Sequence, residues 1–68
     1  MEKVNIQKEK RIYGKQLKFY RHYNDLTLVE LSDKLDITDG YLSRIENGKA
    51  TVGFKLLLKI KALTGITL

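Results

Sequence analysis

The segment from Leu26 to Gly48 limits most strongly what this chain can fold into. Thr27 precedes apolar residues spaced three and four apart, and Glu30 completes the pattern of a helix-capping box. Thr38 precedes a second run with helical spacing, and Gly48 follows that run where a left-handed residue commonly ends a helix. Two helices this short are not stable alone, so the segment predicts a pair of helices around a tight turn, packed against flanking helices.

The rest of the chain also has helical spacing, and no stretch alternates as a strand would. The spacing predicts a compact all-α domain with helices over about residues 8–24, 28–35, 39–47 and 52–64. Residues 1–7 are expected to form a basic arm or a frayed helix start, and residues 8–68 the helix-turn-helix domain. Helical spacing favours core packing over base stacking for the aromatic side chains Tyr13, Phe19, Tyr20 and Tyr23.

The composition argues against several classes of protein. The 68 residues contain no cysteine, which rules out disulfides and thiolate metal sites, and no apolar run of membrane-spanning length. They contain no paired carboxylates, nucleophile–base set, metal-ligand cluster or glycine-rich phosphate loop. We therefore expect a cytoplasmic protein that is not an enzyme and that uses no metal, cofactor, membrane or small-molecule substrate.

Positive charge is concentrated near the N-terminus. The chain has a formal net charge of +5, and seven of its thirteen Lys and Arg residues lie within the first 21 positions. A polyanionic partner explains this placement, and so does an ordinary solvated helix face. The helix-turn-helix pattern favours nucleic acid as the partner.

The second helix of the pair has a face suited to a DNA groove. If Leu42 and Ile45 are buried, turns of about 100° per residue place a small polar set on the opposite face: Gly40, Ser43, Arg44 and Asn47. Small polar residues with one long planar cation suit a helix in the major groove. An ordinary solvent-exposed face has the same pattern, so both interpretations remain open at this point.

The run from Leu42 to Gly48 reads Leu-Ser-Arg-Ile-Glu-Asn-Gly, and its flanking elements contain Leu26-Thr27, Glu30-Leu31, Lys34-Leu35, Ile37-Thr38 and Leu57-Leu58-Lys59-Ile60. With these residues, the chain from about position 12 to 67 resembles the Cro and phage-repressor type of helix-turn-helix regulators, the xenobiotic-response-element family. The resemblance implies a lambda-repressor-like fold of four to five helices with the third helix in the major groove. It also implies binding to double-stranded DNA as a homodimer.

The resemblance also implies a set of site residues. The third helix would read bases through its first residues and its polar face: Thr38, Asp39, Gly40, Ser43 and Arg44. Phosphates would be bound by Thr27 and by the loop after the third helix, with cations of the first helix adding charge: Asn47, Gly48, Lys49, Lys15 and Lys18. Arg21 and Glu46 stand where members of the family often pair an arginine with a glutamate. They form either a half-buried tie between the first and third helices or a weak surface pair.

Several positions depart from the family pattern, and three of them bear on the turn and on base reading. Asp36 stands where glycine usually makes the turn, and aspartate tolerates the left-handed conformation less well. Asp39 and Gly40 stand where long polar side chains usually read bases. The carboxylate of Asp39 either accepts from cytosine N4 or turns back to cap the helix, while Gly40 lets the backbone approach DNA closely.

The fourth helix and the tail carry more apolar residues than one small core can use: Phe54, Leu57, Leu58, Leu63, Ile66 and Leu68. We expect them to form the dimer interface, unless residues beyond Leu68 in a longer chain cover them. Two functions remain in view. The first is a sequence-specific transcriptional regulator, a repressor that reads a near-palindromic operator. The alternative is a protein-interaction or antitoxin-type module with a degenerate helix-turn-helix.

Overall fold

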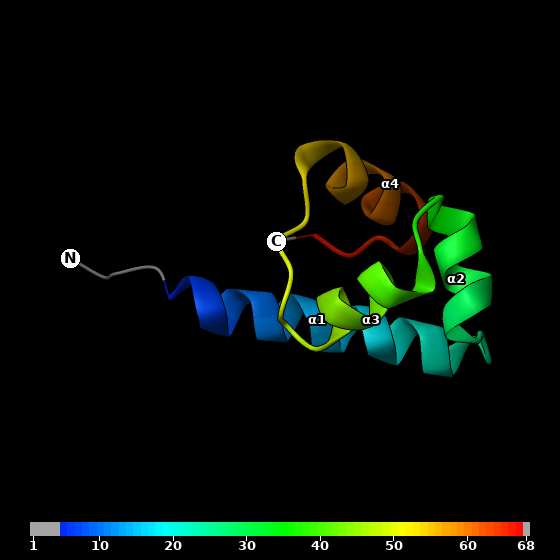
Figure 1. Ribbon diagram of the computed structural model, residues 1–68, viewed down its shortest axis with the longest axis horizontal. Coiled ribbons are helices and arrows are strands. Elements are labelled where there is room, and N and C mark those ends of the chain that lie inside the picture. The colour runs from blue at the N-terminus through cyan, green and yellow to red at the C-terminus, as the bar shows by residue number, and fades with distance from the viewer. Residues whose placement is uncertain (1–4, 68) are drawn as a thin grey trace.

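The computed structural model describes residues 5–67, which form four α-helices and no strand (Figure 1). The helices are α1 (Ile6–Tyr23), α2 (Leu28–Leu35), α3 (Asp39–Glu46) and α4 (Phe54–Thr64). The expected all-α fold is thereby confirmed. None of these helices is long and apolar enough to cross a membrane. Residues 1–4 of the expected arm and Leu68 of the expected interface lie outside the described residues.

The two central helices begin at the predicted residues because their caps form. Thr27 Oγ1 accepts from the N–H of Glu30 at 3.1 Å, and the N–H of Thr27 donates to Glu30 Oε1 at 2.9 Å. This backbone hydrogen bond from Thr27 lowers the pKa of Glu30. At the start of α3, Thr38 Oγ1 accepts from the N–H of Tyr41 at 3.1 Å. The first residues of both helices are therefore determined by capping hydrogen bonds that the sequence predicts.

The turns after these helices both need a left-handed residue. Gly48 follows α3 with φ of 72°, and the N–H of Lys49 donates to the carbonyl of Arg44 at 2.8 Å. Asp36 follows α2 with φ of 58°, and the N–H of Ile37 donates to the carbonyl of Ser32 at 3.0 Å. The two turns use the same helix-ending hydrogen bond, although aspartate adopts this conformation at a cost of about 1 kcal/mol.

Two predicted helix boundaries need correction. α1 begins at Ile6 and not at residue 8, because Asn5 Oδ1 accepts from the N–H of Lys8 at 3.1 Å and caps the helix earlier. α4 begins at Phe54 and not at residue 52, because Val52 packs against the core and Gly53 is extended. Gly65 then ends α4 in the left-handed conformation, with φ of 80°.

Seven side chains from all four helices form the core: Tyr13, Leu17, Leu31, Leu35, Leu42, Ile45 and Ile60. Figure 1 shows α1 along one side and α4 along the opposite side, with α2 and α3 between them. The segment after α4 returns between α4 and α1. Because Leu42 and Ile45 are buried, the opposite face of α3 is held at the surface.

α1 and α3 approach each other closely at Gly14. A Cβ atom at this position would overlap the carbonyl oxygen of Ile45 and lie 2.7 Å from that of Glu46. No larger residue fits there without moving α3. The glycine that weakens α1 in isolation therefore allows the helices to pack.

The prediction of core packing is wrong for two aromatic residues. Phe19 and Tyr23 are 70% and 78% exposed, and their rings stack on each other with centroids 6.1 Å apart. They lie four residues apart on the outward face of α1, while Tyr13 is buried and Tyr20 is partly buried. Helical spacing alone did not reveal which of two neighbouring stripes faces inward.

Candidate nucleic-acid interface

The outward face of α3 brings together the residues expected to read bases. Thr38, Asp39, Gly40 and Arg44 are exposed, and Ser43 is half-buried beside them. Apart from its chain neighbours and the backbone of its own helix, nothing lies within 4 Å of the place where a Cβ of Gly40 would stand. The first two turns of α3 therefore present a polar surface of mostly short side chains, where another molecule can approach the helix backbone.

Two of these residues also stabilise the start of the helix. Thr38 uses its hydroxyl oxygen as the N-cap, and Asp39 Oδ1 accepts from the N–H of Gly40 at 2.9 Å. The carboxylate of Asp39 thus turns back onto the first turn, where the helix dipole favours negative charge. The long side chain that remains on this face is Arg44.

Arg44 lies at the edge of the face that adjoins the next loop. Its Nη2 donates to the carbonyl oxygen of Lys49 at 3.4 Å, a long and weak hydrogen bond. Tyr41 holds the same loop two residues further on, since its hydroxyl donates to the carbonyl of Thr51 at 2.7 Å. The guanidinium is therefore positioned over the loop but is not locked in place.

The loop that follows α3 rests on α1. Asn47 Nδ2 donates to the carbonyl of Ser43 at 2.8 Å. A Cβ at Gly48 would lie 2.8 Å from Cγ of Arg11, so glycine is required by packing as well as by its positive φ. Lys49 is exposed at the end of this turn. The expected phosphate-binding residues of the loop thus sit directly beside α1.

Arg21 and Glu46 form a two-pronged ion pair between α1 and α3. Nε of Arg21 lies 2.8 Å from Oε2 of Glu46, and Nη2 donates to Oε1 at 3.0 Å. Nη1 also donates to the carbonyl of Leu26 at 3.2 Å. The two side chains are only 11% and 4% exposed, and the hydrogen bond to Glu46 raises the pKa of Arg21. This geometry matches the half-buried tie and not the surface pair.

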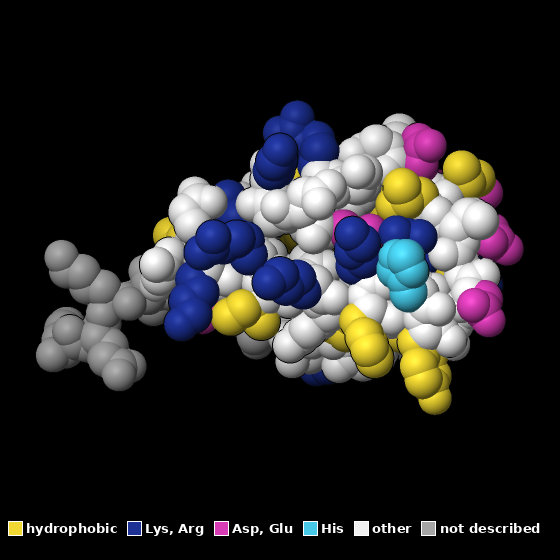
Figure 2. Space-filling view, turned by 90° about the horizontal axis from the view of Figure 1, so that it is seen from below, with side chains coloured by type: hydrophobic (Ala, Val, Ile, Leu, Met, Phe, Trp, Pro, Cys, Tyr) yellow, Lys and Arg dark blue, Asp and Glu magenta, His cyan; other side chains and the backbone are white. Residues whose placement is uncertain are grey.

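Basic residues gather beside α3. Figure 2 shows Lys and Arg side chains mainly over the half of the molecule nearer the N-terminus, with Asp and Glu side chains at the opposite end. Lys15 and Lys18 share a hollow with Arg11, Glu46 and Asn47. Thr27, the other expected phosphate contact, is exposed at the start of α2 and does not line this hollow. The positive surface and the outward face of α3 therefore adjoin.

Sequence reasoning missed Arg11 and Lys10 as members of this surface. Arg11 packs against the loop at Gly48, and Lys10 lines a second hollow with Arg44 and Lys49. The signal was present in the spacing of the cations along α1, which was read only as net charge. Among residues 5–67, no three His, Cys, Asp or Glu side chains form a group able to hold a metal ion.

Of the apolar residues expected at a dimer interface, some pack against the core and others are exposed. Leu57 and Ile66, both expected at a dimer interface, pack partly against the core. Phe54, Leu58 and Leu63 remain 76%, 50% and 38% exposed. The surface available for association on α4 is therefore smaller than the sequence implied.

Comparison with known families agrees with this geometry. A family model described as helix-turn-helix, of the Cro/C1 type, matches residues 17–68, which include all of α2, α3 and α4. Among curated proteins, no sequence matches closely enough to add to this assignment. The chain therefore belongs to the Cro/C1-type, or xenobiotic-response-element, family of helix-turn-helix domains, a family of DNA-binding transcription regulators.

Proposed function

We propose that this protein is a sequence-specific transcriptional repressor that places α3 in the major groove of a near-palindromic operator. The observation that carries the proposal is the outward face of α3, which is polar, has mostly short side chains and is bordered by a basic surface. A major groove admits a helix of this kind, and the basic border supplies the phosphate contacts that hold it in register.

Each part of the face has a distinct role in this proposal. Arg44 donates two hydrogen bonds to O6 and N7 of a guanine, and Ser43 contacts an adjacent base edge. Gly40 brings the helix backbone near the bases, while Thr38 and Asp39 hold the helix start. Phosphates are bound by the start of α2, by the loop and by α1: Thr27, Asn47, Lys49, Lys15 and Lys18. Gly48, which was also expected to bind phosphate, is buried and its N–H donates to the carbonyl of Ile45 at 3.0 Å, so its role is to shape the loop.

The protein acts as a homodimer in this proposal, through α4. Phe54 and Leu58 are exposed apolar side chains on one face of α4, which is typical of an association surface. Leu63 is also exposed, but it lies about 140° from Leu58 around the helix. A two-fold dimer would place two recognition helices about 34 Å apart, one turn of DNA. Such a dimer reads a near-palindrome, and it is weak alone and strengthened on DNA.

Two single substitutions separate base reading from phosphate binding. Arg44→Ala is expected to lose about 1–3 kcal/mol of discrimination at one base pair of each half-site. Lys49→Ala is expected to weaken binding to all sequences by a similar factor, because a phosphate contact carries no sequence information. The measurement is affinity for a selected operator and for a random duplex of the same length, at one salt concentration.

The proposal requires the two variants to differ. If Arg44→Ala and Lys49→Ala reduce the affinity for both duplexes in the same ratio, Arg44 is a phosphate contact and α3 does not read through it. If neither variant changes DNA affinity, the face has another partner and the interaction-module alternative is favoured.

A further inference from the structure

The first turns of α1 lie outside the part of the chain that matches the family. The helix spans Ile6–Tyr23, whereas the family model begins at residue 17. Figure 1 shows these turns projecting past α3 and α4. Only a small part of this extension is needed for the core, which it enters through Tyr13.

A regular basic stripe runs along the extension and into the following turn of α1. Its cations are spaced three, four and three residues apart, and all are exposed: Lys8, Arg11, Lys15 and Lys18. Turns of about 100° per residue place these four side chains within an arc of about 80°. Glu9 is the only acidic residue of α1, and it lies about 140° from the centre of the arc. The stripe therefore has no anionic partner on its own helix face.

The stripe faces the flank of α3 that borders the proposed groove contact. Arg11, Lys15 and Lys18 line one hollow together with Asn47 and Glu46. The carboxylate of Glu46 is already paired with Arg21. The hollow thus keeps a net positive charge, and it lies beside the loop that Arg11 supports at Gly48.

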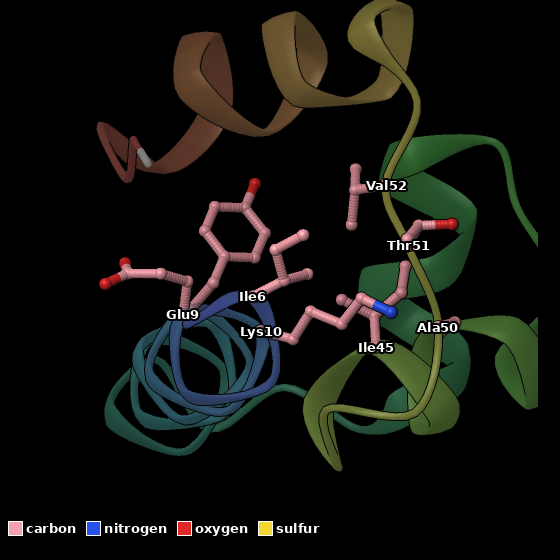
Figure 3. Close-up of a pocket in the computed structure, with 8 residues that line it drawn as sticks. Ile6, Glu9, Lys10, Ile45, Ala50, Thr51 and Val52 are labelled. Atoms are coloured by element: carbon pink, nitrogen blue, oxygen red, sulfur yellow. The ribbon is translucent and has the colours of Figure 1, made fainter. Parts of the chain in front are cut away.

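A fifth cation reaches the other side of the same loop. Figure 3 shows Lys10 extending from α1 toward Ala50, at the edge of a cavity of about 500 Å³. Lys10 also lines the hollow that contains Arg44 and Lys49. Its apolar stem lies along the cavity while its charge joins two others, as long basic side chains commonly do. Cations from α1 therefore stand on both sides of the loop.

We propose that the extension of α1 is a second backbone-binding element, which binds phosphates of duplex DNA outside the base pairs faced by α3. Lys8, Arg11 and Lys15 span about 10 Å of helix axis, the axial length of about three phosphates on one strand. The element strengthens binding to every sequence and adds no base preference. This inference rests on the proposed function, because it needs α3 to be placed on DNA.

The test removes three charges at a time from two faces of the protein. One variant carries Lys8→Gln, Lys10→Gln and Arg11→Gln, and it keeps Lys15, which the proposed function already uses. The matched control carries Lys55→Gln, Lys59→Gln and Lys61→Gln, three exposed positions of α4. Glutamine has nearly the same helix propensity as lysine and arginine, so both triples are expected to fold, which circular dichroism verifies. Affinity for a 30-base-pair duplex is measured at several salt concentrations, with hydroxyl-radical footprints at the lowest.

The α1 triple is expected to reduce the slope of log K against log salt by about 2.7, since each phosphate contact contributes about 0.9. It is also expected to lose backbone protection next to the site while keeping its sequence preference. The α4 triple is expected to leave the slope and the footprint as in the wild type. Equal effects from the two triples, or no effect from the α1 triple, would overturn the inference. A wild-type protein that does not bind DNA at all would instead overturn the proposed function.

Discussion

At the scale of single residues, the joint between α1 and α3 depends on one guanidinium. Arg21 donates to both carboxylate oxygens of Glu46 and to the carbonyl of Leu26, so it joins α1, α3 and the turn before α2. Glu46 immediately precedes the loop that contains Asn47 and Lys49. The pair therefore fixes the position of the proposed phosphate-binding loop relative to the first helix.

Removing Arg21 is expected to leave a buried carboxylate without its partner. Arg21→Ala should lower the free energy of unfolding by about 3 kcal/mol, because breaking a buried pair from one side is costly. Lys18→Ala, on the exposed face of the same helix, should change it by less than about 0.5 kcal/mol. Urea denaturation gives both values.

A double-mutant cycle with Glu46→Gln isolates the interaction between the two side chains. A coupling free energy of at least about 1 kcal/mol is expected for a pair of this geometry. Coupling indistinguishable from zero would mean that Arg21 stabilises the fold only through Leu26 and its own packing.

At the scale of elements, α1 and α3 pack closely because one residue lacks a side chain. Gly14 faces the carbonyl oxygens of Ile45 and Glu46 at the end of α3. Gly40 also lies within a helix but faces open space. The two glycines thus allow a matched comparison of packing against helix propensity.

Gly14→Ala should destabilise the protein by about 1–3 kcal/mol despite the better helix propensity of alanine, since the new methyl group forces α3 away. Gly40→Ala should stabilise it by up to about 1 kcal/mol and should weaken DNA binding by keeping the backbone from the bases. Thermal unfolding monitored by circular dichroism gives both signs. Stabilisation by Gly14→Ala would show that the helices can separate at no cost.

The sequence was sufficient to predict the elements whose ends have local chemical signals. α2 begins and ends at the predicted residues, because the capping box at Thr27 and the turn after Leu35 depend only on neighbouring residues. The start of α4 was misplaced because Val52 is held by the core, which is a tertiary effect. The exposure of Phe19 and the close approach at Gly14 were missed for the same reason.

The site was predictable to a similar extent. The outward residues of α3 follow from helical periodicity once Leu42 and Ile45 are taken as buried. The roles of Arg21 and Glu46 came from resemblance to the family, since no spacing rule links positions so far apart. The sequence showed that cations are concentrated in α1. Only the position of α3 in the structure showed which surface these cations face.

At the scale of the whole molecule, two apolar surfaces are exposed. One consists of Phe54 and Leu58 on one face of α4, and the other is formed by Ile12, Phe19 and Tyr23 on α1. A small soluble domain seldom exposes two such surfaces without using one of them for association. The proposed dimer uses the first.

Leu58→Gln should therefore weaken self-association at least tenfold, because a two-fold interface loses the buried leucine twice at about 1.5 kcal/mol or more each. Phe19→Gln removes an exposed apolar side chain from the other surface and should leave association unchanged. Sedimentation equilibrium over a range of protein concentrations measures both. If Phe19→Gln weakens self-association and Leu58→Gln does not, the dimer interface lies on α1 and not on α4.

In the proposed function, the basic surface and the outward face of α3 together bind duplex DNA. Titration of the wild-type protein with a duplex at several salt concentrations tests it most directly. If Lys15, Lys18, Lys49 and one neighbour neutralise about four phosphates per subunit, log K should fall with log salt at a slope near −3.6, and more steeply if the extension of α1 also binds. No binding at low salt, or a slope near zero, would contradict the account and favour a protein-interaction module.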